Sequence, residues 1–332
     1  MLSRRGLNGV IALGVAAAVS SAVAVKAQPQ FTVVGSIAGP ADRLDVQGRF
    51  AYLAGGKTLA VVDISNPASP KRAGTYESPE KIWGFRVIGS LVYLAADFFG
   101  LGILEVDGSG SPALRGSIKT PGQAKNVAVV GTHALVADHM SGVDHIDVSN
   151  VAKPVNLGSF FLDGYARDVV STGSMAYAVD APTGLYIFDL SKPGPLEAIT
   201  SVQTASAPGS IVLADTSAAE GLRLALLVGG GALQVYDISS AAAPARIATF
   251  KTPSGRPLRA RLSGRTAYVA DGREGLQVVD LSTPSAPRLV GGYKTTSPAR
   301  DVAVANGHVF VATGAGGEEV SHGELVILRQ TP

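Results

Sequence analysis

Positively charged side chains recur along the chain at intervals of roughly 40 residues, each near the start of an apolar run. Arginine can hold a carboxylate or phosphate through two parallel hydrogen bonds, and several cations around one opening attract anions. The residues at these positions, among them one tryptophan, are Arg43, Trp83, Lys125, Arg167, Arg259 and Arg300. The sequence therefore predicts a ligand-binding site for an anion if the fold brings these residues together.

A second polar set follows the apolar runs and could contribute to the same site. Its members are Asp97, Asp138, His139, Asp180 and Asp271. Asp138 or Asp180 could do acid–base chemistry with His139, but no neighbouring residue is marked as a nucleophile, so we predict no catalytic residue. In the alternative, structural reading, Arg167 pairs with Asp168, Arg300 pairs with Asp301, and the other aspartates complete a set of ion pairs.

The aromatic and histidine residues leave several possibilities open. Trp83, the single tryptophan, stands where other repeats carry charge, and Phe98 and Phe99 follow in the same repeat. These rings could stack a ligand ring, fill the core or face a partner. His139, His322, Glu318 and Glu319 are metal-ligating types, but the repeat places His139 across the ring from the other three. We predict no metal and no other cofactor.

All these residues belong to a unit that recurs about every 43 residues. Each unit holds an apolar run, a glycine, an alanine-rich run, a segment like Val61-Val62-Asp63-Ile64-Ser65 and, often after a proline, a fourth short run. The glycines should adopt the positive φ that tight hairpins need, and the aspartate should hydrogen-bond the backbone of the following turn. The hairpin glycines are Gly48, Gly89, Gly131, Gly173, Gly264 and Gly307, and the aspartates are Asp63, Asp147, Asp189, Asp237 and Asp280.

Seven units of four strands predict an all-β, seven-bladed β-propeller of four-stranded antiparallel blades. We place a single propeller domain at 28–332, with repeats near 31–71, 72–114, 115–155, 156–198, 199–246, 247–288 and 289–332. An N-terminal strand, Phe31 to Ile37, should join the last blade beside Glu324 to Arg329 and close the ring as three strands plus one. The stretch from Ala214 to Gly221 should form a long hairpin tip. In such a ring both polar sets would lie at one mouth of the pore.

Three segments resemble the repeat of LVIVD-repeat proteins: Leu59 to Asp63, Leu276 to Asp280 and Leu325 to Leu328. The resemblance covers Phe31 to Pro332 and rests on the sevenfold recurrence. It implies a propeller of a largely exported group whose functions are mostly unassigned, and it implies no activity.

Composition excludes several other classes of protein. The 332 residues are 46% hydrophobic and 16% charged, which suits a large core, and the absence of cysteine excludes disulfides and thiol chemistry. Residues 1–27 combine Arg4 and Arg5 with a small-residue apolar run and match a secretory signal peptide, by either the Sec or the twin-arginine route. Its removal would change the net charge from +2 to −1, so we expect no nucleic-acid partner.

The sequence favours binding over catalysis. We expect a periplasmic or secreted monomer, with no membrane span after signal cleavage, that acts as a ligand-binding or protein-interaction module. Its partner would be an unknown protein or a small anionic ligand at the cationic mouth. The alternatives are a hydrolase or lyase, metal-assisted or not, acting on an anionic or sugar substrate in the same mouth, and a scaffold that uses the rim.

Overall fold

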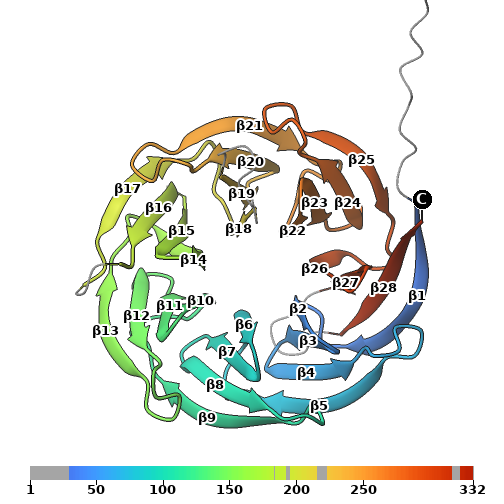
Figure 1. Cartoon of the computed structure of the whole chain (residues 1–332), viewed down its shortest axis with the longest axis horizontal. Coiled ribbons are helices and arrows are strands. Elements are labelled where there is room, and N and C mark those ends of the chain that lie inside the picture. Colours follow the sequence, from blue (N-terminus) through green and yellow to red (C-terminus); the bar gives the residue numbers. More distant parts are fainter. Residues whose placement is uncertain (1–29, 183, 192–194, 215–222, 316–321, 332) are drawn as a thin grey trace, which may run out of the picture.

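The computed structural model of the chain describes residues 30–182, 184–191, 195–214, 223–315 and 322–331. In these residues the strands form seven four-stranded antiparallel sheets, which Figure 1 shows as blades arranged in a ring. The centre of the ring, where side chains of the a strands line a small cavity, is called the channel here. The predicted seven-bladed β-propeller is confirmed. The predicted signal peptide, residues 1–27, and residues 215–221 of the predicted hairpin tip lie outside the described residues.

Each blade has four strands, called a to d here from the channel to the rim. Blade 1 consists of β2 (Arg43–Gln47), β3 (Phe50–Gly55), β4 (Thr58–Asp63) and β5 (Lys71–Glu77), and blade 2 of β6 (Gly84–Ile88), β7 (Leu91–Ala96), β8 (Gly100–Val106) and β9 (Pro112–Ile118). Blade 3 consists of β10 (Asn126–Val130), β11 (His133–Ala137), β12 (Val143–Asp147) and β13 (Val155–Phe160), and blade 4 of β14 (Tyr165–Thr172), β15 (Met175–Ala181), β16 (Gly184–Asp189) and β17 (Ala198–Gln203). In blades 5 to 7 the strands are β18 (Ser210–Leu213), β19 (Leu224–Gly229), β20 (Ala232–Asp237), β21 (Ala245–Lys251); β22 (Arg259–Ser263), β23 (Thr266–Ala270), β24 (Leu276–Asp280), β25 (Arg288–Tyr293); β26 (Ala299–Ala305), β27 (His308–Gly314), β28 (Gly323–Thr331), β1 (Gln30–Gly39).

The ring closes as the sequence predicts. The N-terminal strand β1 is strand d of blade 7 and pairs with β28 from Gln30↔Thr331 to Gly39↔Gly323. Figure 1 shows the two strands side by side at the rim. This pairing covers an edge that would otherwise be free to pair with another chain.

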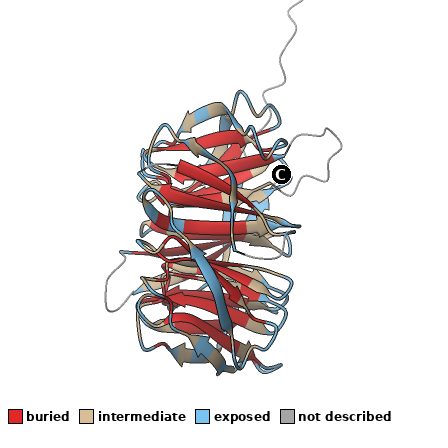
Figure 2. Ribbon diagram, turned by 90° about the vertical axis from the view of Figure 1, so that its left-hand side faces the viewer, coloured by how far each residue is buried: buried red, intermediate tan, exposed pale blue. Residues whose placement is uncertain are grey.

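The core consists of layers between neighbouring blades. Strands b and c are short runs of Ala, Val, Leu and Ile that are buried on both faces, because each blade is packed between two others. Strand d alternates half-buried and exposed residues at the rim. Figure 2 shows the buried strands filling the thickness of the disc, with exposed residues in the loops of both faces.

The repeated turns have the predicted chemistry. The hairpin glycines adopt positive φ, for example 59° at Gly48 and 56° at Gly264. The repeated aspartates accept hydrogen bonds from the backbone two residues later, as in Ser65 N to Asp63 Oδ1 at 2.9 Å. These bonds hold the pKa of Asp63 below its usual value, first through the Ser65 hydroxyl and then through its N–H. Five aspartates are thereby explained by the turns that they cap.

Candidate functional site

A cavity opens where the a strands begin, on the face that we call the mouth face. The cavity, called the mouth cavity here, has a volume of about 310 Å³. Six of the eleven predicted site residues line it. Its lining residues are Arg43, Trp83, Lys125, His139, Arg167, Ala181, Ala207, Pro208, Gly209 and Arg259.

The blade geometry sets the depth of each cation. Trp83 and Lys125 immediately precede strand a, where their N–H groups donate to Ala95 and Ala137 of strand b. Arg167 reaches the same level through a β-bulge between Ala166 and Asp168. Bulges of this kind redirect a side chain, here toward the mouth. Arg43 and Arg259, in contrast, are the first residues of β2 and β22, so they lie one residue deeper in the channel.

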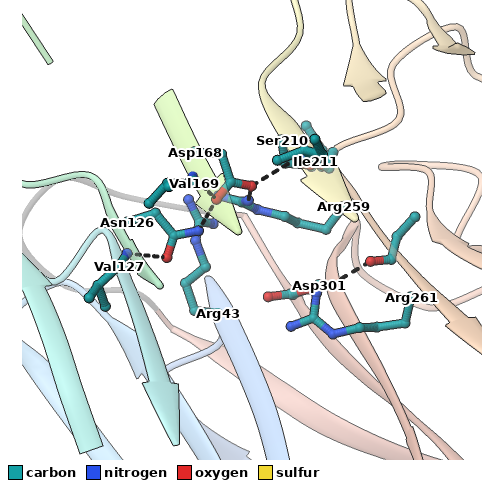
Figure 3. A network of polar contacts seen from close by, with 12 residues as sticks. Arg43, Asn126, Val127, Asp168, Val169, Ser210, Ile211, Arg259, Arg261 and Asp301 are labelled. Atoms are coloured by element: carbon teal, nitrogen blue, oxygen red, sulfur yellow. Dashed lines mark hydrogen bonds and ion pairs between the residues drawn. The ribbon is translucent and has the colours of Figure 1, made fainter. Parts of the chain in front are cut away.

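Asp168 is the centre of the polar network in the channel below the cavity (Figure 3). Its Oδ2 accepts hydrogen bonds from Arg259 Nη1 at 2.8 Å and from Ile211 N at 3.0 Å. Its Oδ1 accepts from Val169 N at 2.9 Å and from the side-chain amide of Asn126. In blade 7, Asp301 accepts from Leu44 N of blade 1 at 3.1 Å. The a strands are thus joined by buried carboxylates.

Arginines outnumber aspartates in the channel lining. The charged residues around its narrow part are Arg43, Arg86, Arg259, Arg261, Asp168 and Asp301. Burial and the neighbouring Arg259 lower the pKa of Arg43 to about 9, so this guanidinium remains charged at neutral pH. Burial and Arg261 lower the pKa of Arg86 as well. For Arg261, the carboxylates of Asp301, Asp45 and Asp168 outweigh burial, and its pKa is raised.

Trp83 organises the lysines at one wall of the cavity. Its Nε1 donates to Asp97 Oδ2 at 3.1 Å. The Nζ atoms of Lys81 and Lys125 lie 4.0 and 4.1 Å from the ring centroid, a cation–π arrangement. The ring therefore holds two ammonium groups beside the cavity.

His139 forms the neighbouring wall. Its ring stacks on Tyr165 with centroids 4.7 Å apart and an interplanar angle of 11°. Burial lowers its pKa, and Lys125 and Arg167 lower it further. Burial, Arg167 and Lys81 lower the pKa of Lys125 in the same way, against the opposing effect of Asp97 and Asp138. Burial is the largest cause of both shifts, and the neighbouring cations add to it.

The sequence matches the LVIVD repeat four times, at residues 38–78, 121–161, 163–204 and 259–295. The chain is an LVIVD-repeat β-propeller protein. The matched segments fall on blades 1, 3, 4 and 6. The resemblance that the repeated Asp-containing segments suggested is confirmed.

Two solved structures share the fold of this LVIVD-repeat propeller. The computationally designed Ika8 protein aligns with a TM-score of 0.61 at 9% identity, over 86% of this chain and 83% of that chain. BamB from Moraxella catarrhalis aligns with a TM-score of 0.56 at 11% identity, over 90% of this chain and 98% of that chain. At these identities the likeness shows the fold alone. No curated protein matches the sequence.

The predicted aspartates do not line the mouth cavity of the LVIVD propeller. Asp138, Asp180 and Asp271 have no exposed surface. Asp138 and Asp271 accept hydrogen bonds from Thr120 and Thr252 at 2.7 and 2.6 Å, and Asp180 accepts from the backbone of the turn that follows it. These carboxylates therefore hold the adjoining loops in place. The sequence prediction of a mixed-charge mouth is wrong for these three residues.

Asp97 occupies a different position from the one the sequence alignment gave it. It forms an isolated bridge with Ala124, as His139 does with Ala166 and Gly272 does with Ala299. Asp97 is therefore the equivalent of His139 rather than of Asp138. Its carboxylate binds the Trp83 indole instead of capping the turn.

The ion pairs also differ from those expected. Asp168 pairs with Arg259, not with its neighbour Arg167. Arg300, on a bulge equivalent to that of Arg167, lies 3.3 Å from Asp42 Oδ1, outside the mouth cavity. Strand geometry explains both results, since adjacent residues of a strand point in opposite directions.

The residues described here contain no cluster of three or more His, Asp or Glu side chains that could hold a metal ion. His322 lines a separate cavity with Lys57 and Arg72. Glu318 and Glu319 lie outside the described residues. Nor does any helix within the described ranges have the length and apolarity needed to cross a membrane.

Sequence reasoning missed the inner cations and the lysine beside Trp83. Arg86 and Arg261 are the third residues of β6 and β22. By strand register, the equivalent residues in blades 3 and 4 are Ala128 and Val170. The available signal in the sequence was a charged residue at a repeat position that is apolar in most blades. Lys81 lies in a connection before strand a, where the repeat has no fixed pattern.

Proposed function

We propose that this LVIVD propeller is a binding module whose mouth cavity holds the carboxylate, sulfate or phosphate group of its ligand. One observation carries the proposal. Four cationic side chains line the cavity, and the described residues that line it include no carboxylate. A cavity of about 310 Å³ is at the lower end of the roughly 300–1,000 Å³ of small-ligand sites.

The state of the cations supports the same proposal. Arg43 and Arg259 form the floor, and the Nε of Arg43 is buried without a hydrogen-bond partner. Arg167 is exposed and forms no ion pair with any described residue. The lowered pKa values of Lys125 and His139 follow partly from neighbouring cations. An anion in the cavity would offset this mutual repulsion, which gives its binding a favourable electrostatic contribution.

We further propose that the module works outside the cytoplasm, as a periplasmic or secreted monomer. The signal-like residues 1–27 support this location. The partner would be a small anionic ligand or the acidic part of a protein. Among the described residues that line the mouth cavity, no acid–base pair supports the alternative hydrolase or lyase activity.

Calorimetric titration with sulfate and with citrate tests the proposal. We expect saturable binding of at least one of them, and Arg167→Ala should weaken it about tenfold or more, because a charge-assisted hydrogen bond contributes about 1.5–3 kcal/mol. Arg246→Ala is the matched control, since Arg246 is an exposed arginine of rim strand β21. Absence of binding by both anions, or equal effects of the two variants, would overturn the proposal.

A further inference from the structure

Three blades share one type of turn between strands b and c on the mouth face. The turns are 96–100 in blade 2, 138–142 in blade 3 and 271–275 in blade 6. Each ends in a glycine with positive φ: 85° at Gly100, 82° at Gly142 and 74° at Gly275. In each, that glycine N–H donates to the carbonyl of the second residue, as Gly142 does to His139. The residues of the three turns can therefore be compared one by one.

The third residue of this turn faces solvent, and its type differs between blades. Blade 6 has Arg273, an exposed polar residue of the kind that ordinarily occupies a solvent-facing position. Blades 2 and 3 have Phe98 and Met140, whose side chains are 57% and 69% exposed. The fold does not require an apolar side chain here, because blade 6 forms the same turn without one.

The connection between strands d and a shows the same departure in blade 3. Phe161 directly follows Phe160, which pairs with Val143, the first residue of strand c. The side chain of Phe161 is 73% exposed. In five of the other six blades the equivalent residue is polar: Glu77, Lys119, Gln203, Lys251 and Lys294. In blade 7 it is the small residue Ala38. Among the described residues, Phe161, Met140 and Phe98 are the three most exposed large apolar side chains.

These three side chains belong to neighbouring loops. A Cβ on Gly142 would lie 2.8 Å from Cα of Phe161, so the Met140 turn contacts the Phe161 connection. On its other side, the Met140 turn contacts Gly122 in the connection between strands β9 and β10. Ala124 of the same connection forms a β-bridge with Asp97 of the Phe98 turn. The three residues thus lie on a series of contacting loops of blades 2 and 3, and their exposed side chains are together called the apolar surface here. It borders the wall of the mouth cavity formed by Trp83, Lys125 and His139.

Two of these turns hold a side chain in a backbone conformation that favours glycine. Asp97 and His139 have φ of 41° and 53°, where blade 6 has a glycine with φ of 55°. A side chain in this conformation costs stability and tends to persist at functional sites. Here the two side chains are those that hold Trp83 and line the cavity.

We propose that the apolar surface and the mouth cavity together dock an acidic polypeptide segment: a Glu or Asp side chain enters the cavity, and a neighbouring Phe, Leu or Trp of the segment packs on Phe98, Met140 and Phe161. This inference rests on the proposed function, because it assigns the anion to a polypeptide. Protein interfaces are enriched in aromatic residues, Met and Arg at their cores, which is the composition found here. The cations lie recessed in a cavity beside the apolar residues, a shape that fits an extended carboxylate side chain better than a flat bilayer.

Three synthetic peptides of equal length provide the probes, measured by fluorescence anisotropy with the purified protein. One alternates Glu with Phe and Leu, the second replaces Phe and Leu by Ser, and the third replaces Glu by Lys. We expect the first peptide to bind at least tenfold more tightly than either of the others. Equal binding of the first two would overturn the inference.

A triple variant, Phe98→Gln, Met140→Gln and Phe161→Gln, removes the apolar surface without adding charge. Gln203 already occupies the position equivalent to Phe161, and Arg273 shows that a polar residue suits the turn. The variant should bind the first peptide about tenfold or more weakly and bind sulfate as the wild type does. Leu114→Gln, an exposed rim residue, is the control that should change neither.

Each contrary result has its own meaning. If neither sulfate nor citrate binds, the proposed function fails. If one binds but the triple variant keeps full affinity for the first peptide, the docking inference alone is overturned. It is overturned as well if the triple variant specifically loses binding to phosphatidylglycerol vesicles, which would make the apolar surface a membrane contact, or loses a self-association of the wild type, which would make it an interface between copies.

Discussion

Asp168 of blade 4 and Arg259 of blade 6 form a buried ion pair in the channel, with 2.8 Å between Oδ2 and Nη1. The pair spans blade 5, which contributes its own hydrogen bond from Ile211 N to the same carboxylate oxygen. Blade 3 contributes the amide of Asn126. One carboxylate therefore connects four consecutive blades, as Figure 3 shows.

We expect Asp168→Ala to lower the free energy of unfolding by about 3–5 kcal/mol, because removing one partner of a buried pair leaves the other charge uncompensated. Chemical denaturation of wild type and variant measures the effect. Glu105→Gln is the control: Glu105 pairs with Arg115 at the exposed rim, and such a pair contributes about 0–1 kcal/mol. A loss at Asp168 no larger than the loss at Glu105 would contradict a structural role for the network.

The repeat made the fold predictable. Seven copies of one pattern fix strand number and order, and each hairpin glycine and turn aspartate follows from backbone chemistry that is local in sequence. The closing strand was predictable because a d-type strand precedes the first unit and the last unit lacks one. These features need no knowledge of how blades lie relative to one another.

The site was predictable only in part, since it depends on distances between blades. Arg167 and Lys125 were predicted as members of the cationic set that recurs at the start of strand a, and they do line one cavity. The partner of Asp168 could not be read from the sequence, because Arg259 is 91 residues away. Asp97 was misaligned because the turn residue with positive φ is usually glycine, and nothing local marks Asp97 as its equivalent.

The closing strand gives a second prediction. Phe31, Val34 and Ile37 of β1 pack against the layers on either side of blade 7, and an apolar side chain contributes about 1.5–3 kcal/mol when fully buried. A chain that begins at Pro40 should therefore melt at least about 10 °C below one that begins at Gln28 and should aggregate through the free edge of β28. Differential scanning calorimetry and light scattering measure both effects. Equal melting temperatures would show that blade 7 is stable with three strands.

Glycines in the d strands give a third prediction. Strand d of blade 2 lies so close to blade 3 that a Cβ on Gly116 would be 2.1 Å from the carbonyl oxygen of Val151. Gly116→Val should lower the free energy of unfolding by about 1–3 kcal/mol, because the backbone of blade 3 would have to shift. Gly108→Val is the matched control, since no heavy atom lies within 4 Å of its Cβ position. A similar cost for the two variants would argue against close contact of these blades.

Two buried carboxyl groups of blade 3 predict a pH dependence of stability. Asp144 has no exposed surface, accepts a hydrogen bond from Ser159 and shares one with Asp138. Burial first, and then the charge of Asp138, raises the pKa of Asp144 to about 7. Burial raises the pKa of Asp138 as well. The pair therefore holds a proton at pH values where the unfolded chain has released it.

Because the folded pKa of Asp144 lies above its unfolded value near 4, the folded state binds more protons between about pH 4 and 7. The stabilising contribution of this proton is complete below pH 4 and is lost as the pH rises to 7, at up to about 1.4 kcal/mol per pH unit. Asp144→Asn removes the ionisation, so its melting temperature should rise relative to wild type as the pH increases from 4.5 to 7.5. Leu114→Gln, an exposed rim substitution that changes no titratable group, should show no such trend. A constant difference between Asp144→Asn and wild type across this range would mean that the two carboxyl groups do not share a proton.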